Sequence, residues 1–260
     1  MLVRRLGGAA VAAVLAAVPA AVPAAALAQG GGLAPTPPEA NNVPYDGRFT
    51  FVRIWFEPRG AGNGFWRRDL KWDHDYPRAE RHFTKILSEI TSLRPNTEGS
   101  QILSFESPEI FKYPVAYVSE PGFWQPTDKA AENLRSYMLK GGFVIFDDFV
   151  GPAHWYNFTT AMQKVMPQGR LVPLDVSHPI FDSFFKVNSL EEMQSPYGVQ
   201  PQWWGMFEDN DPKKRLMLIA DFNNDIGDYW EWSDAGFFPI QISNEAYKLG
   251  VNYVVYALTR

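Results

Sequence analysis

Apolar and polar residues follow one another in blocks that predict alternating strands and helices. Short runs of β-branched and aromatic residues predict buried strands, and apolar residues at helical spacing predict helices. The predicted strands are Arg48–Phe56, Val115–Val118, Phe143–Phe146 and Leu171–Val172, with a hairpin of Trp203–Phe207 and Leu216–Ala220. The predicted helices follow Asp75, follow Thr127 as far as Gly141, run over about Ala153–Val165, and open at Asn244.

This alternation predicts an α/β fold, with a mostly parallel sheet flanked by helices on both faces. In such sheets, ligands bind beyond the carboxyl ends of the strands. That rule places Asp147 and Asp148, at the end of the Phe143–Phe146 strand, on one functional edge with the segment Asp221–Trp232. Neighbouring residues of a strand point to opposite sides. We therefore expect one acid of the pair to line a pocket and the other to cap the helix over Ala153–Val165.

The amino-terminal residues predict an exported protein. Arg4 and Arg5 precede an Ala/Val/Leu run with two prolines, and Ala28 ends a small-x-small site. This order is typical of a signal peptide rather than a membrane anchor. We expect cleavage after Ala28 and a periplasmic or secreted mature protein without a transmembrane span. The Arg4-Arg5 pair leaves the twin-arginine route open beside the general secretory one.

The rest of the chain divides into two parts. Residues 29–44 are rich in Gly and Pro and predict a flexible linker, and residues 45–260 suit a single α/β domain. Loss of Arg4 and Arg5 changes the formal charge from -5 to -7 (-5 minus 2). An acidic domain has no electrostatic attraction to nucleic acid. The absence of cysteine excludes a thiol nucleophile, disulfides and thiolate metal sites.

Several blocks of the sequence resemble a known family. They are Gly141–Phe149, Trp155 with Phe158 and Met162, Pro167, His178–Phe181, Asn224–Glu231, and Gly250–Tyr253 with Tyr256. In this order they are similar to the bacterial domain-of-unknown-function family numbered 4159. The resemblance implies a flavodoxin-like fold related to class I glutamine amidotransferases. Those enzymes use a cysteine on a strand-to-helix elbow, and this chain has none. We therefore expect that it is not a functional cysteine-dependent amidotransferase.

The segment Asp221–Trp232 reads DFNNDIGDYWEW and admits three interpretations. An EF-type calcium loop needs Gly at its sixth position and Glu at its twelfth, where Ile226 and Trp232 stand. A different divalent cation site can use Asp225, Asp228 and Glu231. Alternatively, the acids and amides shape turns while the aromatic residues pack beneath them.

Three histidines complete the candidate site. His178 precedes a proline in a block of the family resemblance, and His154 begins a predicted helix close to Asp147 and Asp148. His74 lies in a long loop that can close over the same edge. No dense metal-ligand spacing, such as His-x-x-x-His, accompanies them.

These residues predict an exported cell-envelope protein of unknown function. We expect a non-catalytic domain that binds a small molecule, a saccharide or an envelope protein at the polar sheet edge. The candidate edge residues are Asp147, Asp148, His154, His178, Asp225, Asp228 and Glu231. The alternative is a carboxylate- or metal-dependent hydrolase acting on saccharide or another envelope component, with or without a divalent cation as its cofactor.

Overall fold

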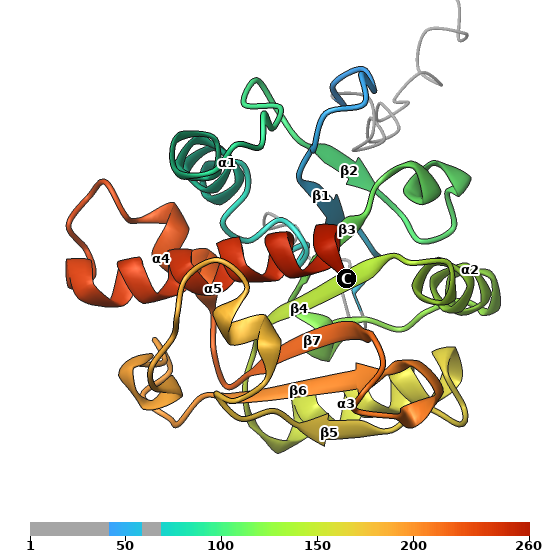
Figure 1. The fold of residues 1–260 in the computed structure, drawn as a ribbon. Helices are drawn as coiled ribbons and strands as arrows, with labels where there is room; N and C mark the ends of the chain where they lie inside the picture. Colours follow the sequence, from blue (N-terminus) through green and yellow to red (C-terminus); the bar gives the residue numbers. More distant parts are fainter. Residues whose placement is uncertain (1–41, 59–68) are drawn as a thin grey trace, which may run out of the picture. The chain divides into compact units, whose positions relative to one another are not determined.

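The computed structural model describes residues 42–58 and 69–260. The predicted signal peptide and most of the predicted linker therefore lie outside the described residues. One seven-stranded sheet forms the centre of the described part, in the order β2-β1-β3-β4-β7-β6-β5 (Figure 1). The strands are β1 (Val52–Ile54), β2 (Gln101–Leu103), β3 (Val115–Ser119), β4 (Phe143–Phe149), β5 (Leu171–Pro173), β6 (Gln202–Phe207) and β7 (Leu216–Phe222).

The sheet is mostly parallel, as the alternation of strands and helices predicts. β1 pairs in parallel with β2 and β3, β3 with β4, and β4 with β7. β6 and β5 extend the sheet beyond β7 with antiparallel pairs. The carboxyl ends of β3, β4 and β7 therefore meet at one edge, which is the arrangement the sequence predicts.

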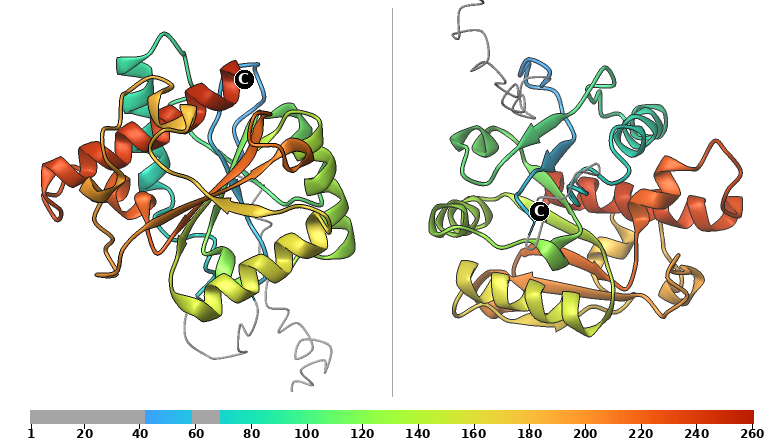
Figure 2. Two further views of the ribbon diagram at one scale, coloured as in Figure 1. Left: turned by 60° about the horizontal axis from the view of Figure 1, so that its bottom comes forward. Right: turned by 180° about the vertical axis from the view of Figure 1, so that it is seen from behind.

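Helices cover both faces of the sheet. They are α1 (Arg78–Ile90), α2 (Asp128–Leu139), α3 (Gly151–Val165), α4 (Ile226–Glu231) and α5 (Ile240–Thr259). Seen from behind, α1, α4 and α5 lie on one side and α2 and α3 on the other (Figure 2). Short 3-10 turns connect these elements at Pro108–Lys112, Pro121–Phe123, Pro179–Asp182, Leu190–Glu192 and Glu208–Asn210.

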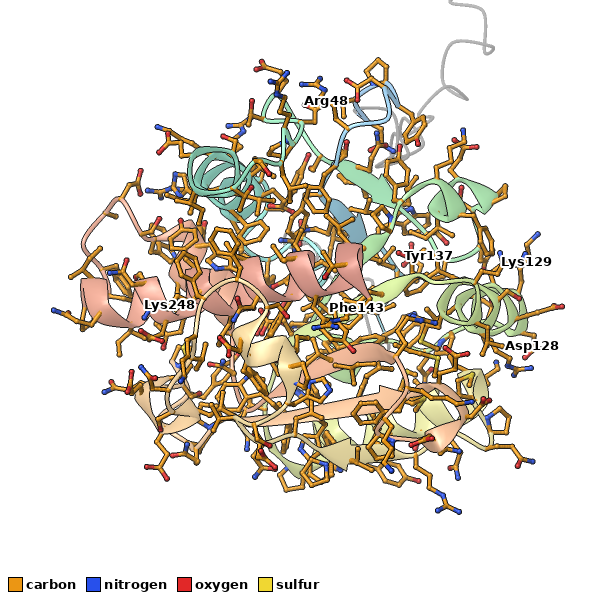
Figure 3. All side chains as sticks on the ribbon, viewed as in Figure 1. Arg48, Asp128, Lys129, Tyr137, Phe143 and Lys248 are labelled. Atoms are coloured by element: carbon orange, nitrogen blue, oxygen red, sulfur yellow. The ribbon has the colours of Figure 1, made fainter. Side chains whose placement is uncertain are left out.

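Strand alternation divides the apolar core into two layers. Val144 and Phe146 of β4 pack with α2 and α3, whereas Phe143 and Ile145 pack with α1, α4 and α5. Thr127 begins α2 as predicted, because its hydroxyl accepts a hydrogen bond from the Ala130 amide at 3.1 Å. Charged residues face outward in Figure 3, where Asp128 and Lys129 point away from α2 while Phe143 lies inside.

Three elements differ from the sequence prediction. β2 was missed, and α4 replaces part of a segment expected to be irregular. α5 begins at Ile240 instead of Asn244. Within the described residues, no helix combines the length and apolar character that crossing a membrane requires.

Candidate functional site

Acidic side chains gather at the carboxyl ends of β3, β4 and β7. Glu120 directly follows β3, Asp148 lies near the end of β4, and Asp225 stands three residues after Phe222 of β7. A backbone hydrogen bond from the Glu120 amide to the Asp147 carbonyl, 3.1 Å long, fixes β3 against β4 at this point. The parallel sheet thus brings together acids that are far apart in the sequence.

A bulge in β4 places both acids of the Asp147-Asp148 pair on this edge. The register with β7 shifts between Phe146 and Phe149, and Asp148 has a φ of 62°. A residue in this left-handed conformation interrupts the alternation of side chains along a strand. Asp147 and Asp148 can therefore both face the end of the sheet, and each has a separate set of contacts.

Asp147 anchors helix α4 to the sheet. Its Oδ2 accepts hydrogen bonds from the Tyr117 hydroxyl at 2.7 Å and from the amides of Ile226 at 2.9 Å and Gly227 at 3.1 Å. The side chain is fully buried, and burial raises the pKa of the carboxyl to about 7 although these hydrogen bonds lower it. Asp147 therefore binds the first amides of α4, a helix other than the one for which the sequence predicts a capping acid.

The prediction that this acid caps α3 is wrong. The Gly151 amide at the start of α3 donates to Oδ1 of Asn223 at 3.0 Å. The neighbouring Val150 amide donates to Nδ1 of His154 at 3.3 Å. An amide and an imidazole therefore take the place that the sequence analysis assigned to an aspartate.

Asp148 faces the cluster and is almost entirely buried. Its Oδ2 accepts a hydrogen bond from the Ser119 hydroxyl at 3.1 Å, and its Oδ1 accepts one from the Tyr197 hydroxyl. Its neighbour on the solvent side is His74, whose Nδ1 lies 3.6 Å from Asp148 Oδ2. Asp148 is therefore the acid at which the β3 and β4 ends, the Tyr197 loop and the His74 loop meet.

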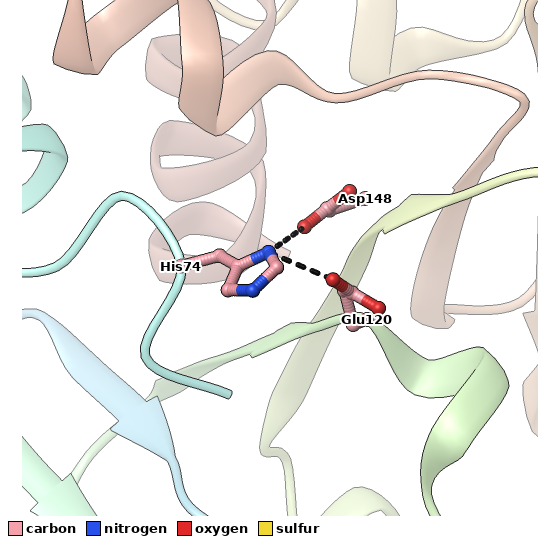
Figure 4. A group of neighbouring side chains, drawn as sticks. All are labelled: His74, Glu120 and Asp148. Atoms are coloured by element: carbon pink, nitrogen blue, oxygen red, sulfur yellow. Dashed lines mark ion pairs between the residues drawn. The ribbon is translucent and has the colours of Figure 1, made fainter. Parts of the chain in front are cut away.

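His74 lies over the carboxylate-rich edge, beside Glu120 and Asp148. This agrees with the expectation that its loop can close over that edge. Its Nδ1 lies 2.7 Å from Oε1 of Glu120, and its Nε2 lies 2.9 Å from Oδ1 of Asp69 (Figure 4 shows the contacts with Glu120 and Asp148). Hydrogen bonds with Asp148 and Glu120 raise the pKa of His74 to about 11. The imidazole is therefore a cation at neutral pH.

Asp75 connects two groups of acids. One oxygen each of Asp75, Asp148 and Asp225 lie within 4.8 Å of one another, and the same holds for Asp75, Asp228 and Glu231. Burial first, and then the charge of Asp148, raises the pKa of both Asp75 and Asp225 well above the usual range. Carboxylates so close together are the kind of ligands that a hard divalent cation prefers.

The acids of the Asp221–Trp232 segment have different roles. Oδ1 of Asp225 accepts a hydrogen bond from the Asp228 amide at 2.9 Å and so caps α4. Burial and the charge of Asp148 raise the pKa of Asp228 to about 6, and burial raises the pKa of Glu231. The short helix over residues 226–231 excludes an EF-type loop. The packing of aromatic residues is confirmed for Tyr229 and Trp230, which are buried.

Unlike His74, the predicted site histidines His154 and His178 pack against aromatic rings. The ring of His154 packs edge-on against Phe123, with ring centres 4.6 Å apart, and burial lowers its pKa. His178 packs on Phe207, at the end of β6, and on Tyr256. Phe207 pairs with Leu216, the first residue of β7, so His178 lies at the opposite edge of the sheet. Its expected place on the functional edge is therefore wrong.

Sequence reasoning missed Asp75 and Glu120 as members of the cluster. Glu120 follows the predicted strand Val115–Val118 after one residue, so the strand-end rule that selected Asp147 and Asp148 also covers it. Asp75 carries no comparable signal in the sequence. It precedes α1, and its place at the site follows from the path of residues 69–77.

Fold and site together define a class: an α/β domain with a mostly parallel sheet and a carboxylate-rich edge. Residues 63–258 match the family model described as "Domain of unknown function (DUF4159)". The chain belongs to this family, as its sequence blocks indicated. The matched range begins after β1 and includes all the acids of the edge. Comparison with curated proteins finds no match to this sequence.

Proposed function

We propose that this protein is an exported, non-catalytic binding domain of the cell envelope. Its carboxylate-rich edge would bind a small molecule, a saccharide or a partner protein that presents positively charged or hydrogen-bond-donating groups. The single observation that carries this proposal is the convergence of acids on Asp148: Glu120 lies with it beside the His74 imidazole, and one oxygen each of Asp75 and Asp225 lies within 4.8 Å of it.

The charge of the edge supports a ligand with donor groups. Among the described residues, Lys71 and His74 are cations that contact Glu120, with nitrogen atoms 3.4 Å and 2.7 Å from its Oε1. Both also contact Asp69. Their charge is therefore shared with an acid outside the cluster, and a cationic group bound at the edge would favour the charged form of the buried acids Asp75 and Asp225. Complementary charge would attract and orient a positively charged group.

The contacts of the polar residues favour binding over catalysis. His74 is protonated at neutral pH and so cannot accept a proton as a general base. The Ser119 hydroxyl donates to Asp148 and does not contact a histidine. Asp147 already accepts hydrogen bonds from Tyr117 and the start of α4. The acids and the imidazole thus stabilise one another and form no nucleophile–base pair among the described residues.

One observation favours the hydrolase alternative. The pKa of Asp228, raised to about 6, suits a group that exchanges a proton near neutral pH. A hydrolase of this type would use Asp228 as acid or base and a second carboxylate, such as Asp148, to hold a cation or water. Saccharides or other envelope components are its expected substrates.

The binding function is tested on the mature protein isolated from its own cells. Native mass spectrometry should find a non-covalent companion that denaturation releases. A double variant, Asp148→Asn with Asp225→Asn, should lose it. A matched double variant, Asp128→Asn with Asp209→Asn, should keep it, because both acids are exposed ion-pair partners distant from the edge. Retention of the companion by the first variant would refute the proposed site.

The same variants test the hydrolase alternative. Envelope saccharides and peptides are incubated with the protein, and released products are measured. A turnover that disappears in Asp148→Asn with Asp225→Asn, while circular dichroism shows a folded protein, would make the chain an enzyme. Binding without turnover over the whole panel supports a binding domain.

Export is tested by the mass of the mature protein. We expect a mature chain that begins at Gln29, because Ala28 ends the small-x-small site. A chain that keeps residues 1–28 in the membrane fraction would contradict the proposed cleavage.

A further inference from the structure

We propose that the inner part of this edge binds one hard divalent cation through Asp75, Asp148 and Asp225. The inference deepens the proposed binding function, because it names the class of ligand that the most buried acids take. The ion would lie where the end of β4, the cap of α4 and the loop before α1 meet.

The geometry of the three carboxylates fits a calcium-sized ion. One oxygen from each residue lies within 4.8 Å of the other two. Calcium binds oxygen ligands at roughly 2.3–2.6 Å, so two ligands of one ion are at most about 5 Å apart. Asp148 and Asp225 are 4% and 5% exposed. These acids therefore suit a single ion better than an organic molecule, which needs a wider opening.

A buried oxygen of Asp75 independently indicates a missing partner. Although the Asp75 residue reaches the surface in part, its Oδ2 is buried, and no described residue donates a hydrogen bond to it. A buried carboxylate oxygen without a partner carries a desolvation cost, which a bound cation removes. Gly227 places this oxygen in the cluster, because a Cβ at that position would lie 2.5 Å from Asp75 Oδ2 and 3.3 Å from Asp225 Oδ1.

Arg53 is an alternative partner for Asp75, because its charge acts on that carboxyl group. Its Nε binds Glu80, and its Nη1 donates to the carbonyl oxygens of Trp72 at 3.1 Å and His74 at 2.9 Å. These contacts direct its charge to Glu80 and to the backbone of the loop. Its Nη2 has no partner among the described residues, so a contact between Arg53 and Asp75 is the rival explanation that the experiment must separate.

The second group of acids can complete the coordination of the ion. Asp75 also lies within 4.8 Å of Asp228 and Glu231, measured between single oxygens. Calcium takes six to eight oxygen ligands, and three carboxylates supply only part of such a shell. Asp228 and Glu231 are only partly buried, so water can reach the same place and supply the remaining ligands.

The cation site is tested by titrating the purified, EDTA-treated and dialysed protein with CaCl2, MnCl2 or MgCl2. Calorimetry and elemental analysis after equilibrium dialysis should give one bound ion per chain for at least one of these salts. Asp225→Asn should weaken that affinity at least tenfold. This change removes the charge but keeps an α4 cap, because Asn caps helices as well as Asp does. Asp75→Asn should have a similar effect.

The control and the thermal stability separate the ion from the alternative. Asp128→Asn with Asp209→Asn should bind the ion as the unchanged protein does. The metal-free Asp75→Asn variant should have an unchanged or higher Tm, because burying a neutral amide costs less than burying a carboxyl group among other acids, and it should lose the rise in Tm that the ion causes. A lower Tm in metal-free Asp75→Asn, with no effect of ions on either protein, would show that Arg53 is the partner and would overturn the inference.

The outcomes also distinguish this inference from the wider function. A companion molecule on the protein from its own cells, together with no ion uptake by the purified protein, would leave the binding function and refute the cation site. Uptake of one ion, with only that ion on the protein from its own cells, would support the cation site and refute the wider function.

Discussion

The buried acids predict that the metal-free protein becomes less stable as the pH rises from 5 to 8. Asp147 has an unfolded pKa near 3.8 and a folded pKa of about 7, so between these values the folded state holds more protons than the unfolded state. Stability then falls with rising pH. Over the two units from pH 5 to 7, Asp147 alone lowers the unfolding free energy by about 2 kcal/mol, because the slope of ~1.4 kcal/mol per unit flattens as the pH approaches the folded pKa.

Asp228 and His74 act in the same direction, as do Asp75 and Asp225, whose pKa values burial raises well above the usual range. The pKa of Asp228 rises from 3.8 to about 6, so its effect extends to that pH. The pKa of His74 rises from 6.5 to about 11. Its contribution to the unfolding free energy is therefore complete below pH 6.5 and decreases as the pH rises from 6.5 to about 11. Asp69, whose pKa falls to about 2, loses its stabilising contacts only in more acidic solution.

Urea unfolding of the EDTA-treated protein, followed by tryptophan fluorescence at constant ionic strength, measures this slope. The unfolding free energy should decrease from pH 5 to pH 7, and Asp147→Asn should make this decrease smaller. Asp209→Asn, at an exposed ion pair, should leave it unchanged. An unfolding free energy that stays constant or increases over this range would refute the assignment of raised pKa values to these acids.

Three substitutions test contacts that position the site, each measured by urea unfolding. Gly227→Ala should destabilise the fold by about 1–3 kcal/mol, because its Cβ would lie 2.5 Å from Asp75 Oδ2 and 2.7 Å from the Tyr117 hydroxyl; a neutral effect would mean that α4 moves freely. Arg53→Met should cost about 3–5 kcal/mol, because it leaves Glu80 buried without its ion-pair partner; a stability equal to that of the unchanged protein would contradict a stabilising role for this ion pair. Thr127→Ala should cost about 1 kcal/mol through loss of the α2 cap, whereas Thr127→Ser should have little effect.

The parts of the fold that the sequence predicted are those with strong local patterns. β4 and β7 are continuous apolar runs, and α2 has both an apolar face and a capping Thr127. β2, with three residues, is too short for a periodic signal and depends on its pairing with β1. α4, with six residues, depends on its cap and on Asp147, which is distant in the sequence.

Sequence reasoning located the site through one rule, that ligands bind beyond the carboxyl ends of parallel strands. That rule placed Asp148 correctly at the edge with Asp225, because both follow or end central parallel strands. His178 was assigned to the edge through its sequence block, although it lies at the other end of β7. Asp75 was missed because its position depends on a loop, and local sequence patterns do not determine how a loop crosses the end of a sheet.

The two outermost strands have a consequence for how partners can associate with this protein. β2 and β5 have three residues each, and β5 ends at Pro173, which lacks a backbone amide hydrogen. Edges this short offer few free backbone groups to an incoming strand. Extension of the sheet by a second polypeptide, a frequent mode of peptide recognition, is therefore disfavoured at both sides. Molecules that associate with this domain must recognise its side chains.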